Sequence, residues 1–365
     1  MGIDDHLLQQ NVKEQSDEEI IEMLNGCICC TVRQDLVTVF HKFAKRFETG
    51  LKLDGVIIET TGMADPAPVA QTFFVDEMTQ SFFRLDGIVT MVDAKHIEQH
   101  LDDEKPEGAE NEAVEQVAFA DRLIINKVDL VPEEADLQRI EKRLRGVNKF
   151  APIIRTQRST VSVTDVLDIK AFDLQATLSR DEEFLNTDGE HVHDETVSSM
   201  GINVDEEVDF EMFQDFLQAC LRDKGADLYR IKGVIAIEGA EKKFVYQAVH
   251  MIFQGDFTDE WEEGEPRGCK LTFIGKNLDK EEITQGFNDC LATEENKDKR
   301  AARLRFRIGD VVECNTGAWK RGKVVSLFYR EGSMTAPYQV ELDDGSLIYA
   351  PADDDRLIRK PASDS

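Results

Sequence analysis

Residues 121–129 read Asp-Arg-Leu-Ile-Ile-Asn-Lys-Val-Asp, and this stretch decides the fold of the first part of the chain. A short, continuous apolar run that ends in polar residues is typical of a parallel β-strand buried on both faces. The same pattern occurs at 53–62 and at 84–93. Segments with helical character precede, separate and follow these runs, at 36–47, 66–82, 94–101, 110–120 and 134–147. Alternating strands and helices predict an α/β fold with a parallel sheet.

The polar end of this strand, Asn126-Lys127-Val128-Asp129, indicates recognition of a guanine base. The Asp129 carboxylate can accept hydrogen bonds from both N1–H and the amino group of guanine, a pair of donors that adenine lacks. Lys127 would lie along the plane of the base, and Asn126 would brace neighbouring loops. Since open α/β sheets bind ligands at the carboxyl ends of their strands, the motif predicts selectivity for GTP over ATP. The alternative is a polar surface loop.

Three cysteines lie close together in the stretch Asn-Gly-Cys-Ile-Cys-Cys-Thr at 25–31. Cys27, Cys29 and Cys30 on a tight turn would direct several sulfurs at one point, and Gly26 permits the backbone angles of such a turn. Thiolates are soft ligands that favour Zn²⁺ or Cu(I) over Mg²⁺ or Ca²⁺. The stretch therefore predicts a metal site, open or completed by a fourth ligand. A cluster of small buried residues, or a redox pair with a spare thiol, is the alternative.

A Glu-x-x-Gly pattern follows the first apolar run, with Glu59 and Gly62 at its two ends. In a nucleotide-binding sheet, Glu59 would hold the magnesium-bound water or position the attacking water, and the Gly62 N–H would approach the γ-phosphate. The same segment also fits the start of a helix, because Asp65-Pro66 is a common N-terminal signal.

Composition excludes several classes of partner. The net charge of −30 argues against sequence-independent nucleic-acid binding and against anionic membrane surfaces, because both depend on Lys and Arg. Seven cysteines, four of them isolated, indicate a reducing compartment rather than a disulfide framework. No apolar run has membrane-spanning length, so we expect a cytoplasmic protein, although an upstream targeting segment would change that expectation.

Two further domains are predicted beyond the α/β domain at 1–175. An acidic linker covers 176–204, and 205–295 alternates helix, strands and helix in the manner of a ferredoxin-like α+β sandwich. After a charged connector at 293–302, residues 303–360 form short alternating strands with a strong hairpin signal at Asp343-Asp344-Gly345. This rhythm resembles small all-β barrels of the SH3 or Tudor type.

Taken together, these motifs resemble the CobW-type metallochaperone GTPases, and most closely their eukaryotic branch, the zinc-regulated GTPase metalloprotein activators. The likeness covers roughly residues 15–295 and rests on the stretches at 25–31, 54–66, 104–108, 126–134, 155–159 and 166–168. It implies a P-loop-GTPase-type parallel sheet and a CobW C-terminal domain. By the same resemblance, the cysteine triad binds Zn²⁺, the Asn126–Asp129 motif binds the base, and GTP with Mg²⁺ is the cofactor.

The resemblance also implies a mechanism and a partner. GTP binding and hydrolysis would change the geometry of the cysteine segment, so that the metal moves to a client apoenzyme, which in the eukaryotic branch is a methionine aminopeptidase. The resemblance is also compatible with a homo-oligomer. Two alternatives are a non-catalytic zinc-binding adaptor and a cobalt chaperone of cobalamin synthesis.

The sequence departs from the family at the phosphate-binding loop. The family carries Gly-x-x-x-x-Gly-Lys-[Ser/Thr] upstream of the cysteines, and no such loop precedes them here. The near match at 317–324 ends in Val324, which has no hydroxyl for Mg²⁺, and it lies in a strand-like context. We therefore expect an N-terminally truncated GTPase domain, with loss of turnover as the alternative.

Overall fold

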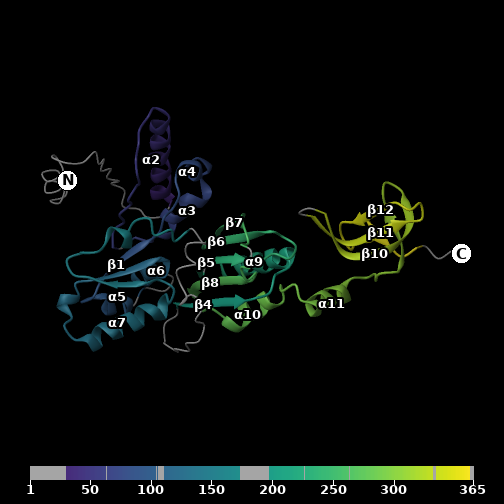
Figure 1. Ribbon diagram of the computed structural model, residues 1–365. Helices are drawn as coiled ribbons and strands as arrows, with labels where there is room; N and C mark the ends of the chain where they lie inside the picture. Colours follow the sequence, from purple (N-terminus) through teal and green to yellow (C-terminus); the bar gives the residue numbers. More distant parts are fainter. Residues whose placement is uncertain are drawn as a thin grey trace. The chain divides into compact units, whose positions relative to one another are not determined.

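The computed structural model describes residues 30–62, 64–103, 105, 111–172, 197–225, 227–262, 264–331 and 334–361. The chain divides into two compact units, 1–84 and 85–365. Figure 1 labels the helices and strands along the chain. No helix in the described ranges combines the length and the apolar character needed to cross a membrane.

The described part of the first unit is built from helices α2 (Cys30–Glu48), α3 (Ala67–Val75) and α4 (Glu77–Phe82) (Figure 1). Apolar residues recur along α2 at helical spacing, and three of them form the buried core of the unit: Leu36, Phe40 and Phe43. The helix ends before Gly50, whose φ of 101° lies in the region that favours glycine. The Asp76 carboxylate caps α4, which explains why the helix predicted at 66–82 divides in two.

The apolar run between α2 and α3 does not form the predicted strand. Residues 51–60 contain neither strand nor helix. Val56, Ile57 and Ile58 are 41%, 79% and 37% exposed, so the expectation of a strand buried on both faces is wrong here. A parallel strand is held by hydrogen bonds to its neighbours, and no described segment pairs with this run. Without a pairing partner, β-branched composition alone does not produce a strand.

The other two predicted strands are confirmed. β1 (Val89–Asp93), β2 (Arg122–Asn126) and β3 (Ile153–Arg155) form a parallel sheet in the order β1-β2-β3. The register pairs Asp93 with Asn126, so the two polar strand ends lie side by side. The crossover helices are α5 (Ile97–Leu101), α6 (Glu112–Phe119) and α7 (Glu134–Val147), which agree with the predicted helical segments.

The α+β part contains one five-stranded antiparallel sheet in the order β4-β8-β5-β6-β7. Its elements are β4 (Val197–Val204), α9 (Phe210–Lys224), β5 (Leu228–Ile235), β6 (Lys242–Val249), β7 (Ile252–Glu260), β8 (Cys269–Lys276) and α10 (Lys280–Asn288). β4 lies within the segment predicted as a linker, and it pairs with β8 along its whole length. The rest of that segment lies outside the described residues. β6 and β7 form a hairpin, because the chain reverses at His250, where φ is 51°.

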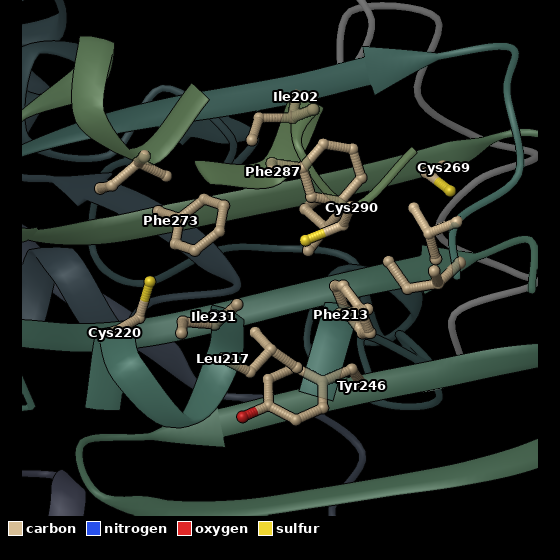
Figure 2. Packing of buried hydrophobic residues seen from close by; sticks show 14 of the residues in the cluster. Ile202, Phe213, Leu217, Cys220, Ile231, Tyr246, Cys269, Phe273, Phe287 and Cys290 are labelled. Carbon is tan, nitrogen blue, oxygen red and sulfur yellow. The ribbon is translucent and has the colours of Figure 1, made fainter. Parts of the chain in front are cut away.

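Both helices pack on one face of this sheet. Figure 2 shows the core that they enclose, with Phe213 and Leu217 of α9 and Phe287 of α10 directed toward Ile231 and Phe273 of the sheet. Three cysteine side chains lie in the same core: Cys220, Cys269 and Cys290. Burial of this apolar surface is the main stabilising contribution to this part of the fold.

A buried ionic cluster joins this sheet to the start of β2. Asp121 forms ion pairs with both Arg230 and Lys232 of β5, and all three side chains are at most 10% exposed. The second Asp121 oxygen accepts a hydrogen bond from the Ile88 amide at 2.9 Å. The Arg230 guanidinium also donates to the carbonyl of Phe119, at the end of α6. The cluster therefore fixes the amino ends of β1 and β2 against β5.

The last part of the chain is a small all-β module, as predicted. Helix α11 (Glu294–Arg303) replaces the expected connector, and an antiparallel sheet follows in the order β12-β11-β10-β9-β13. Its strands are β9 (Val311–Asn315), β10 (Trp319–Glu331), β11 (Met334–Leu342), β12 (Leu347–Ala350) and β13 (Ile358–Arg359). Val324 is fully buried in the core of the module. The near match at 317–324 thus runs into a strand and not into the helix that follows a phosphate-binding loop.

Candidate nucleotide-binding and metal sites

The Asn126–Asp129 motif lies at the carboxyl end of β2. Ile124 and Ile125 are fully buried and fix the strand, and Asn126 is its last residue. Lys127 adopts a left-handed backbone conformation with φ 62°, which turns the chain out of the sheet into the 3-10 helix η1 (Val128–Leu130). The Asp129 side chain is exposed. The motif therefore presents its polar groups to solvent at the edge where parallel sheets bind ligands.

Asn126 braces a neighbouring loop through its side-chain amide. Its Nδ2 donates to Ser159 Oγ at 3.0 Å, and its Oδ1 accepts from the Ser159 backbone amide at 3.0 Å. Ser159 has a φ of 54°, in the region that non-glycine residues rarely adopt. The loop is also tied to β2 by a hydrogen bond from the Thr156 amide to the Ile125 carbonyl, 2.8 Å long. These bonds place the loop beside the motif.

Asp93, at the carboxyl end of β1, holds Lys127. The Lys127 ammonium donates to Asp93 Oδ2 at 2.8 Å, and His96 Nδ1 lies 3.0 Å from the same oxygen. The Lys95 amide donates to the other oxygen at 2.8 Å. Partial burial raises the pKa of Asp93, but the hydrogen bonds from Lys127 and His96 outweigh this effect and lower the pKa to about 2. Asp93 is therefore ionised at neutral pH.

We call Asp93, Asn126, Lys127, Asp129 and Ser159 the strand-end cluster. Three separate segments supply it: the end of β1, the end of β2 with η1, and the loop at 156–160. An exposed carboxylate beside a lysine whose ammonium is already paired can bind a flat base that carries adjacent N–H donors. The cluster therefore offers a ligand one exposed carboxylate, Asp129, and one lysine that is held by Asp93.

The predicted phosphate-side residues lie in the first unit. Glu59 is exposed, in the segment without regular secondary structure. At Gly62, no atom lies within 4 Å of the position that a Cβ would occupy, so its backbone is open to a close approach. A carboxylate oxygen at Glu59 is the kind of donor that Mg²⁺ prefers.

Of the three predicted metal ligands, the structure describes only one. Cys27 and Cys29 lie outside the described residues, and Cys30 is the first residue of α2. The remaining cysteines are buried singly or in the α+β core: Cys220, Cys269, Cys290 and Cys314. Within the described ranges, no three side chains of the metal-ligating types gather around one point.

Sequence reasoning missed the roles of Asp93 and Ser159. In the sequence, Asp93 ends the apolar run at 84–93 and Ser159 ends the stretch at 155–159, and neither position alone indicates its role. A signal for Asp93 exists in the sequence, because two parallel strands that end in polar residues bring those residues together at one edge. No local signal predicts that Ser159 bonds to Asn126, since 33 residues separate them.

Comparison with known proteins places the chain in a family. Residues 1–155 match the model of the CobW/HypB/UreG nucleotide-binding domain, and residues 197–291 match the cobalamin synthesis protein cobW C-terminal domain. Zinc-regulated GTPase metalloprotein activator 1 of Saccharomyces cerevisiae is 31% identical over 309 residues, which span 74% of this chain and 70% of the yeast protein. The chain belongs to the CobW/HypB/UreG family. Its all-β module lies outside both matched regions.

Other members of the CobW/HypB/UreG family support the same placement. Zinc chaperone CobW of Pseudomonas aeruginosa is 30% identical over 325 residues, covering 80% of this chain and 81% of the relative. Zinc chaperone YjiA of Escherichia coli is 26% identical over 288 residues, covering 79% and 85%. The crystal structure of Zn(II)-bound YjiA GTPase from E. coli covers 80% of this chain and 96% of its own, with a TM-score of 0.58 at 23% identity, and it supports the fold.

Proposed function

We propose that this protein is a zinc metallochaperone in which guanine-nucleotide binding and hydrolysis control the transfer of Zn²⁺ to a client metalloenzyme. The observation that carries the proposal is the strand-end cluster, because it joins the family's guanine motif to two further segments of the fold. Relatives named zinc chaperone and GTPase metalloprotein activator support the choice of metal and of nucleotide.

In this proposal the base is bound by the cluster. Asp129 accepts the two donors of guanine, and the methylene stem of Lys127 lies against the ring. Asn126 keeps the loop at 156–160 in place beside the base. Adenine would leave the Asp129 carboxylate without a matching pair of donors, and unmatched polar groups at a binding site are a strong source of selectivity.

The phosphates and the metal involve other segments. Glu59 would hold or position water, and the open backbone at Gly62 would approach the γ-phosphate. Mg²⁺, when bound, neutralises charge that develops on the transferred phosphoryl group. Cys27, Cys29 and Cys30 would hold Zn²⁺ as cargo, and because thiolate ligands must lose their protons, zinc uptake would weaken as the pH falls.

Nucleotide titrations test the first half of the proposal. Calorimetry should show binding of GDP and GTP but not of ADP, and Asp129→Ala should abolish it. Asp215→Ala, which removes an exposed carboxylate from α9, is the matched control and should bind as the wild type does. Guanine binding that survives Asp129→Ala would refute the site.

Zinc titrations test the second half. Cys27→Ala and Cys29→Ala should each lose zinc uptake, whereas Cys220→Ala, in the core of the α+β part, should retain it. Zinc uptake without any guanine binding would favour the alternative of a zinc-binding adaptor. A methionine aminopeptidase is the first client to test, by transfer of zinc from the loaded protein to its apo form.

A further inference from the structure

Asp93 is the residue to which the lysine of the guanine motif is bound. The Asp93 carboxylate accepts a hydrogen bond from the Lys127 ammonium at 2.8 Å. The Asp93 side chain is 27% exposed, and the Lys127 side chain is 50% exposed. The two residues come from adjacent parallel strands, whose register pairs Asp93 with Asn126 directly before Lys127. The ion pair is therefore built by the sheet rather than by chance contact of two surface side chains.

The backbone around Asp93 is fixed from both strands. The Ala94 amide donates to the Asn126 carbonyl at 3.0 Å, and the Lys95 amide donates to Asp93 Oδ1 at 2.8 Å. With one carboxylate oxygen bound to this amide, the other is directed at Lys127 and His96. The carboxylate thus has a fixed orientation before any ligand arrives.

We propose that Asp93 is a positioning residue for guanine binding, which holds Lys127 extended so that its methylene stem forms the platform for the base. This inference rests on the proposed function, because it assigns a role to a residue beside that site. Without Asp93, the four-carbon stem of Lys127 samples many rotamers, and binding must first order it. Because the ion pair already orders the Lys127 stem in the free protein, binding of the base does not have to order it.

A double-mutant cycle in GDP affinity is the test. Asp93→Asn keeps an oxygen that can accept from the Lys95 amide but removes the charge that holds Lys127. We expect it to weaken GDP binding about two- to fivefold, the range for a partly exposed ion pair. In a Lys127→Met background the same change should have no further effect, because the stem is no longer tethered. Asp102→Asn, which breaks an exposed ion pair with Arg143, is the matched control and should bind normally.

The outcomes separate the two proposals. If the wild type binds no guanine nucleotide, the proposed function and this inference both fail. If the wild type binds and Asp93→Asn binds equally well, or loses the same factor with and without Lys127, only the inference is overturned. If Asp93→Asn does not fold, Lys127→Gln is used instead. It removes the same ion pair by changing the more exposed of the two partners. The ratio of wild-type to Lys127→Gln affinity for GDP should then fall as KCl is raised, and a ratio independent of salt would overturn the inference.

Discussion

Removal of Lys232 should change how stability depends on pH. Asp121 carries one negative charge, and both Arg230 and Lys232 bind it in a buried site, so one cation is in surplus. Burial lowers the pKa of Lys232, and the neighbouring Arg230 lowers it further, to about 7 against its ordinary 10.5. The lysine is the group that gives up its proton, because the guanidinium stays protonated.

The magnitude follows from linkage. Between the two pKa values the unfolded chain binds one more proton than the folded chain, so the free energy of unfolding rises with pH. The fully developed slope is about 1.4 kcal/mol per pH unit. Because the folded pKa is about 7, the gain between about pH 6 and about pH 8 is on the order of 1 kcal/mol. Lys232→Met has no such group and should lack this gain.

Urea unfolding at the two pH values, followed by circular dichroism and by tryptophan fluorescence, measures the effect. The difference in the free energy of unfolding between wild type and Lys232→Met should increase by about 1 kcal/mol from the lower to the higher pH. Lys243→Met is the matched control, since Lys243 is similarly buried but faces a single carboxylate, Glu265, at 2.7 Å. A constant difference for Lys232→Met, or one that shrinks with pH, would refute the argument.

Three further predictions concern other parts of the chain. Burial raises the pKa of the Cys269 and Cys290 thiols to about 12, so iodoacetamide at about pH 8 should modify neither in the folded protein, as mass spectrometry of digests would show. Gly322→Ala should destabilise the all-β module by about 1–3 kcal/mol in thermal unfolding, because a Cβ would lie 2.6 Å from the carbonyl oxygen of a neighbouring strand. Asn126→Ala should speed amide hydrogen exchange at Ser159 without changing exchange in the α+β core, and unchanged exchange at that amide would contradict the bracing role.

The sequence was most informative where local pattern and tertiary context agree. The apolar run of β2 is buried as predicted, and α7 has the predicted bounds, because its leucines and isoleucines recur at helical spacing. The run at 53–62 has an equally strong pattern but no strand to pair with among the described residues. Pairing is a property of the whole sheet, so the run's own composition could not decide it.

The residues of the candidate site could be proposed from the sequence, but their geometry could not. The order of Asn126, Lys127 and Asp129 indicates the chemistry, whereas the partners of Asn126 and Lys127 come from segments 33 and 34 residues away. β4 was missed because it follows a polar acidic stretch and pairs with β8, which lies about 70 residues later in the chain. Contacts of this range depend on the folded arrangement.

The most direct test of the account is the zinc affinity of the protein with different nucleotides bound. Competition with a chromogenic chelator gives this affinity in the presence of GDP and of a slowly hydrolysed GTP analogue. If nucleotide state controls the metal site, the two affinities should differ at least about fivefold, the lower range for coupled sites. The difference should vanish in Asp129→Ala. Equal zinc affinities in both nucleotide states of the wild type would contradict the central claim.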